Sequence, residues 1–177
     1  MSASNRPEKT TQTRRGSKVG DVRRILQFYA DAGLFAAFTV TQSARTIGIF
    51  AMTWRYLPRA TLTVDVEAEE FTLLHVLPRV SSRSPMGRSY RQFLINLSAA
   101  DRPSHRRIDS SKVKMASKAT RGGLALRFRV TDRDYDYATR AFVRVLQESI
   151  YEFLLDGPYY DYRVQKLGFD PDRVTLL

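Results

Sequence analysis

Residues 46–77, TIGIFAMTWRYLPRATLTVDVEAEEFTLLHVL, contain the pattern that decides the fold. Thr46–Trp54 carries apolar residues on both faces of an extended chain, which is typical of a strand in the middle of a sheet. Arg59–Val66 then alternates apolar residues with Thr and Asp. The acidic turn 67–70 leads to a return strand, Phe71–Leu77. The whole stretch predicts an antiparallel meander joined by short turns.

Helical patterns flank this meander. We predict a first helix that Asp21 caps and Gly33 ends. A short segment at 35–40 follows it and precedes the meander. The spacing of apolar residues predicts a second, amphipathic helix over Met86–Ser98 and a long third helix from Tyr137 to about Asp156.

A second pair of alternating segments predicts a hairpin made of Lys112–Ala119, a turn over Thr120–Gly123 and Leu124–Val130. If the two strands pair, five basic side chains share the solvent-facing side: Lys112, Lys114, Lys118, Arg127 and Arg129. Like charges opposite each other destabilise a sheet, so this cluster favours an anionic partner. The alternative is an edge hairpin whose lysines and arginines only prevent aggregation.

Together these elements predict an α+β fold. We expect an antiparallel sheet of about five strands with two or three helices packed on one face, in the order α-β-β-β-(β)-α-β-β-α. Residues 1–18 are polar and basic and predict a disordered arm. Residues 19–157 form the single domain, and residues 158–177 are expected to be a C-terminal tail docked on it.

Charge is concentrated in one part of the chain. The 177 residues hold 29 Lys and Arg against 18 Asp and Glu, a net charge of +11. Within 79–129 only Asp101 and Asp109 are acidic, which predicts an attraction for polyanions or an acidic protein surface. Solubility alone is the other interpretation. Besides the five hairpin residues, the candidate anion-binding or nucleic-acid-binding side chains are Arg14, Arg15, Arg88, Arg91, Arg106 and Arg107.

Several kinds of chemistry find no support in the sequence. There is no cysteine, which excludes disulfides and cysteine-ligated metals. Asp132–Asp136 resembles the start of a calcium loop, but it lacks the later glycine and glutamate, so a helix cap at Asp134 or Asp136 explains it better. His75 and His105 belong to no catalytic motif. We therefore expect no catalytic residues, no metal site, no cofactor and no enzymatic activity.

The sequence also bears on location. No apolar run approaches the roughly 20 residues that span a bilayer, and the first twenty residues lack the apolar core of a signal peptide. We expect a soluble, cytoplasmic protein that does not associate with membranes.

Two segments carry a resemblance to a known family, TWRYLPRATLTVDVEAEEFTLLHVLPRV (Thr53–Val80) and GGLALRFRVTDRDY (Gly122–Tyr135). Their layout resembles the YbjN-like / type III secretion chaperone-like fold over about Val22–Phe153. In that family a strand, an acidic turn and a return strand ending in Leu-Pro precede a helix, and a later alternating strand leads into a long terminal helix. Its members tend to be acidic, whereas residues 79–129 here are strongly basic.

The resemblance implies a non-catalytic protein that holds an extended segment of a partner on its sheet or helix face, often as a dimer. It implies no catalytic residues. The first functional hypothesis is therefore a chaperone-like binding module for a protein partner, or for a second copy of the chain, with an anion-attracting basic patch. The alternative is electrostatic, sequence-tolerant binding of nucleic acid by the basic arm and the 112–129 hairpin.

Overall fold

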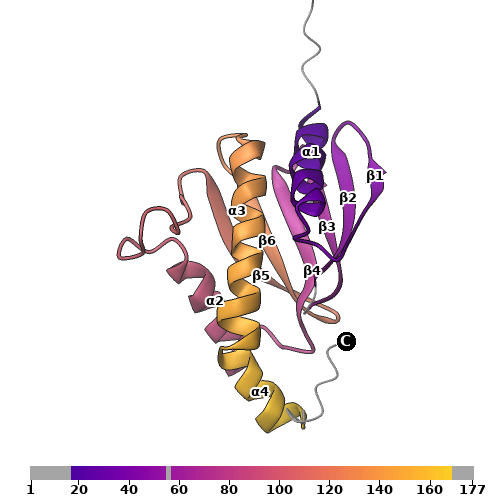
Figure 1. Cartoon of the computed structure of the whole chain (residues 1–177). Coiled ribbons are helices and arrows are strands. Elements are labelled where there is room, and N and C mark those ends of the chain that lie inside the picture. Colours follow the sequence, from indigo (N-terminus) through magenta and orange to yellow (C-terminus); the bar gives the residue numbers. More distant parts are fainter. Residues whose placement is uncertain (1–16, 55–56, 169–177) are drawn as a thin grey trace, which may run out of the picture.

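The structure, a computed structural model, describes residues 17–54 and 57–168. One antiparallel sheet forms the back of the molecule, and the helices gather on one side of it (Figure 1). The described strands are β1 (Ala37–Ser43), β2 (Ile47–Trp54), β3 (Leu57–Asp65), β4 (Glu70–Pro78), β5 (Val113–Thr120) and β6 (Gly123–Val130). Their order across the sheet is β1-β2-β3-β4-β6-β5, so the predicted hairpin joins the meander through β4.

The helical elements of the described residues are α1 (Lys18–Asp31), α2 (Pro85–Asn96), α3 (Tyr135–Glu148), the π-helix η1 (Ser149–Leu155) and α4 (Pro158–Leu167). The α+β class and the antiparallel sheet are confirmed. The structure has six strands where the sequence predicted about five, because the 35–40 segment extends into the edge strand β1. It has four α-helices where two or three were expected, because the C-terminal segment forms α4.

Three of the described helices, α1, α2 and α3, begin where a side chain satisfies a free backbone N–H group. The Asp134 carboxylate accepts the N–H of Tyr137 at 3.0 Å, so one of the two predicted caps of α3 is confirmed. The prediction that Asp21 caps the first helix was wrong. The hydroxyl of Ser17 is the cap, accepting the N–H of Gly20 at 3.1 Å, and Asp21 lies in the first turn.

The structure describes only part of the two ends of the chain. Residues 1–16 of the predicted arm lie outside the described residues, and the helix already begins at Lys18. Gly157 separates η1 from α4, as the sequence predicted for the end of the long helix. Tyr159 of α4 is buried, so this part of the predicted tail does pack on the domain.

The core lies between the sheet and the helices. Alternate residues of the central strands, such as Leu62, Phe71 and Phe128, are completely buried. Phe142 of α3 packs edge-on against both Phe71 and Phe128. Because strand side chains alternate between faces, the residues between these point to the opposite side of the sheet. None of the described helices lies over that side, which we call the outer face (Figure 1).

Candidate anion-binding surface

The β5–β6 hairpin places its basic side chains on the outer face. Phe128 and Val130 alternate with the arginines of β6 and are buried on the helix side. The sheet register pairs Lys114 directly with Arg129. We use the name hairpin face for the four cations that result: Lys114, Lys118, Arg127 and Arg129.

One member of the hairpin face has a partner on the neighbouring strand. The Glu70 carboxylate of β4 accepts hydrogen bonds from Nε and Nη2 of Arg127 and from the hydroxyl of Thr72. Burial alone would raise the pKa of Glu70, but these hydrogen bonds and the guanidinium charge outweigh it and hold the pKa below its usual range. The charge of Arg127 is therefore offset within the fold.

The other three members have no such partner. Among the residues that the structure describes, Lys114, Lys118 and Arg129 form no ion pair. All three are exposed. Lys114 and Arg129 are a cross-strand pair of like charge, an arrangement that destabilises the sheet. Glu70 lies opposite Arg129 on the other neighbouring strand, β4, but its carboxylate is bonded to Arg127, and the charge of Lys118 also helps to lower its pKa.

Across the sheet the outer face changes in chemistry. One row of directly paired residues runs from β2 to β5 through Ile49, Thr63, Thr72, Arg127 and Ala116. The row begins with an aliphatic side chain, continues with two hydroxyls and Arg127, and ends at Ala116. In the next row, a carboxylate oxygen of Asp65 accepts hydrogen bonds from N–H groups of the turn between β3 and β4.

The aromatic side chains of the described strand residues belong to the core cluster, as do Phe50, Trp54, Phe71 and Phe128, or pack against it, as Phe38 does. Stacking of unpaired bases needs exposed aromatic rings. This part of the outer face therefore offers electrostatic and aliphatic contacts without a stacking platform.

A second group of cations surrounds the loop between β4 and α2. Arg88 donates to the carbonyl of Arg83 at 2.7 Å, and Arg91 donates to the carbonyl of Ser82 at 3.0 Å. We call this group the loop arginines; it comprises Arg79, Arg83, Arg88, Arg91 and Arg121. None of them forms an ion pair within the described part of the chain.

Two further basic segments are neutralised by acidic residues from the C-terminal half. Arg106 bonds to Glu152 and lies 3.7 Å from Glu148. Arg102 bonds to Glu148 and also contacts Glu152. Burial of the carboxylate raises the pKa of Glu148, although the charge of Arg102 acts in the opposite direction.

Lys112 is neutralised in the same way. Its ammonium group bonds to Asp134 at 2.7 Å and lies 5.0 Å from the centre of the Tyr137 ring. The hydrogen bonds from Lys112 and from the N–H of Tyr137 hold the pKa of Asp134 below its usual range. Lys112 precedes β5 and does not belong to the hairpin face.

The candidate residues from the sequence are thus divided between separate places. Lys114, Lys118, Arg127 and Arg129 come together on the outer face. Arg88 and Arg91 lie on α2 in the helix layer, Arg106 and Lys112 are ion-paired, and Arg107 donates to the carbonyl of Ala100 at 3.3 Å. Arg14 and Arg15 lie outside the described residues.

Three of the loop arginines, Arg79, Arg83 and Arg121, were not among the candidates from the sequence. The signal for them was present, because residues 71–100 and 110–131 contain no Asp or Glu. No local signal indicated that Glu148 and Glu152 would neutralise the 102–106 segment, since these residues are more than forty positions apart.

The described ranges 17–54 and 57–168 also bear on metal sites and on membrane-spanning helices. No group of three or more His, Cys, Asp or Glu side chains there is arranged to hold a metal ion. None of the helices in these ranges has the length and apolar character needed to cross a bilayer. Comparisons with protein-family models, with curated proteins and with solved structures find no match to this chain.

Proposed function

We propose that this protein is a non-catalytic binding module that holds an acidic protein segment on the outer face of its sheet. The observation that carries the proposal is the exposed in-register pair Lys114–Arg129, which forms no ion pair among the described residues, as is true of the exposed Lys118. The carboxylate of Glu70 lies opposite Arg129 on β4, but it is bonded to Arg127. Carboxylates from a partner would relieve this repulsion and form charge-assisted hydrogen bonds.

The rest of the outer face favours a protein segment over a nucleic acid. Ile47 and Ile49 lie at the far side of the face from the cations, and the side chain of Ile47 is 37% exposed. An aliphatic side chain of a partner has apolar surface to contact there, whereas a nucleic acid would find no aromatic ring for its bases. The resemblance to chaperone-like proteins predicts the same kind of ligand, an extended partner segment, and remains a prediction.

The spacing of the sheet defines the partner further. Neighbouring strands lie about 4.8 Å apart, so Ile49 of β2 and Arg127 of β6 are separated by about 14 Å, the length of about four extended residues. A segment crossing the strands would therefore carry a leucine-like residue about four positions away from its carboxylates.

The experiment measures binding of a fluorescent peptide of about twelve residues with Leu placed four positions from a pair of Glu residues. The variant replaces Lys114, Lys118 and Arg129 by Ala. The matched control replaces Arg23, Arg45 and Lys166, three exposed and unpaired cations elsewhere on the described surface, by Ala. We expect the dissociation constant to rise about tenfold or more in the hairpin-face variant and less than about twofold in the control.

Three outcomes contradict the proposal. Equal weakening by both variants would mean that only the net charge attracts the peptide. Equal affinity for a peptide with the same composition but with Leu beside Glu would exclude the apolar contact. Tighter binding of single-stranded DNA of the same charge, with an affinity that falls steeply with salt and with the hairpin-face substitutions, would identify the surface as a nucleic-acid site.

A further inference from the structure

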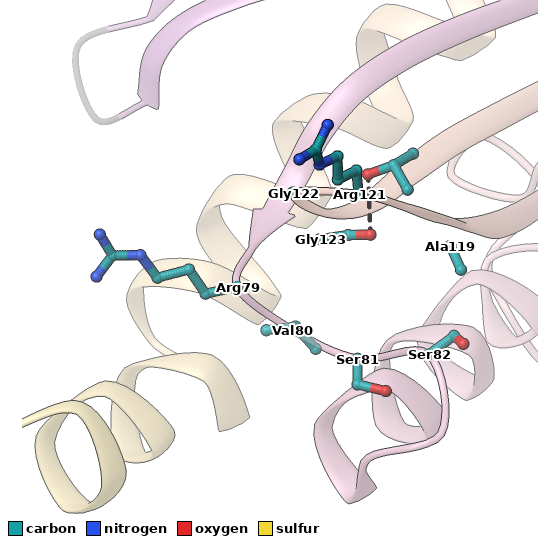
Figure 2. A pocket seen from close by; sticks show the side chains of 9 residues that line it. Arg79, Val80, Ser81, Ser82, Ala119, Arg121, Gly122 and Gly123 are labelled. Carbon is teal, nitrogen blue, oxygen red and sulfur yellow. Dashed lines mark hydrogen bonds between the residues drawn. The ribbon is translucent and has the colours of Figure 1, made fainter.

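A pocket of about 360 Å³ lies at the end of the sheet, where the loop after β4 meets the turn between β5 and β6. Figure 2 shows its two walls, one from the 79–82 segment and one from the hairpin turn. The residues that line it are Arg79, Val80, Ser81, Ser82, Ala119, Thr120, Arg121, Gly122 and Gly123. No carboxylate is among them.

The two walls are fixed to each other by close backbone contacts. The N–H of Arg79 donates to the carbonyl of Gly122 at 3.0 Å. Gly123 has φ +141°, and a Cβ there would lie 2.2 Å from the carbonyl oxygen of Leu77, so only glycine fits. The ring of His75, a residue of β4, also lies close against Gly122. The pocket is therefore part of the tertiary fold.

The strand and loop backbone is strained at this point. Arg79 has φ +60° and His75 has φ +56°, although neither is a glycine. Such conformations cost free energy and persist where the surrounding structure imposes them, often beside a ligand. The hydrogen bond from Arg79 to Gly122 holds the two guanidinium-bearing residues, Arg79 and Arg121, on adjoining parts of the rim.

The pocket combines positive charge with unused donors. The side chains of Arg79 and Arg121 start at its rim and extend away from it and from each other (Figure 2). Both are exposed and have no ion-pair partner in the described ranges. The hydroxyl oxygen of Ser81 accepts the N–H of Arg83 at 3.3 Å, which leaves its hydrogen free to donate. The Ser82 hydroxyl forms no hydrogen bond in this part of the structure.

We infer that this pocket binds a phosphate group, which would accept hydrogen bonds from the Ser81 and Ser82 hydroxyls and from the guanidinium groups of Arg79 and Arg121. A guanidinium group forms two parallel hydrogen bonds with a phosphate. The exposed side chains of Arg79 and Arg121 would turn from the rim to reach it. The volume exceeds that of one phosphate, so the group arrives either as inorganic phosphate or as part of a small phosphorylated molecule. The site is separate from the hairpin face.

The test uses the full chain and follows the backbone N–H signals by NMR during titration with inorganic phosphate and, in a second arm, with a small phosphomonoester. Sodium chloride of equal ionic strength is the reference for unspecific attraction. We expect saturable shifts centred on Ser81, Ser82 and Gly122, with a dissociation constant of about 1 mM or tighter. Saturation with both ligands identifies the phosphate as sufficient, and saturation with the ester alone shows that the organic part is also needed.

Substitutions separate this site from general charge. Arg121→Gln and Arg79→Gln should each raise the dissociation constant about tenfold, whereas Arg45→Gln, an exposed cation in the turn between β1 and β2, should change it less than about twofold. Unfolding curves of each variant check that the fold is intact. Binding absent from both arms, shifts that sodium chloride reproduces, or equal weakening by Arg45→Gln would each overturn the inference.

Discussion

Reversing the charge at Lys114 tests the central observation, because Lys114 and Arg129 face each other in the sheet register. Two exposed charges about 6 Å apart in water repel by about 0.7 kcal/mol. Screening at physiological ionic strength roughly halves this value. Lys114→Glu turns the repulsion into an attraction of similar size, so the free energy of unfolding should rise by about 0.7 kcal/mol, within the range measured for cross-strand pairs.

Urea unfolding, followed through the fluorescence of Trp54, measures this change. Trp54 is the only tryptophan of the chain and is 7% exposed in the fold. For a chain of this length the gain corresponds to about 2 °C in Tm. Lys114→Gln, which removes the repulsion without adding an attraction, should give about half the gain.

The same substitution should weaken binding of the acidic peptide, so that stability and binding move in opposite directions. In about 1 M salt both stability gains should nearly disappear, because the screening length falls to about 3 Å. A loss of stability on Lys114→Glu, or a gain of the same size at high salt, would refute the electrostatic account of the hairpin face.

Three other predictions concern the supports of the site, each measured by urea unfolding. Hydrogen bonds hold the pKa of Glu70 below its usual 4.5, so the stabilisation that Glu70 provides is present above that pH and is lost as the pH falls below it. Glu70→Gln should therefore lower the free energy of unfolding by about 1–2 kcal/mol at pH 7 and by progressively less in acid. A cost that does not change with pH would contradict this. Gly123→Ala should lower the free energy of unfolding by more than about 2 kcal/mol, because backbone atoms must move to admit the Cβ. The control Gly33→Ala, at φ +76° with open space around it, should cost about 1 kcal/mol. Equal costs would exclude a steric cause. Arg102→Met should lower the free energy of unfolding by about 2 kcal/mol at pH 7, because it leaves the buried Glu148 carboxylate without its closest partner. Burial raises the pKa of Glu148, so the carboxylate takes up a proton as the pH falls and the cost should shrink. A cost independent of pH would argue for lost packing instead.

The sequence was sufficient for the elements whose signals are local. Strict alternation in 59–66 and 124–130 specified strands with one buried face, because side chains in a strand alternate between its two sides. The parity of the same pattern correctly placed Lys114, Lys118, Arg127 and Arg129 on one face of the sheet. The change from α-helix to π-helix at Ser149 had no such signal, since both follow the same apolar stripe.

The tertiary structure alone decided which positive charges remain unpaired. The sequence does not distinguish Arg102 and Arg106 from Lys114 as cations that could bind an anion. In the fold, the packing of their loop against the end of α3 brings the two arginines to Glu148 and Glu152. The phosphate pocket also depends on the fold, because its walls lie some forty residues apart along the chain. A periodic pattern reports only how a segment divides its side chains between core and water. Charge compensation and cavities depend on distances between segments, which are fixed only when the core packs.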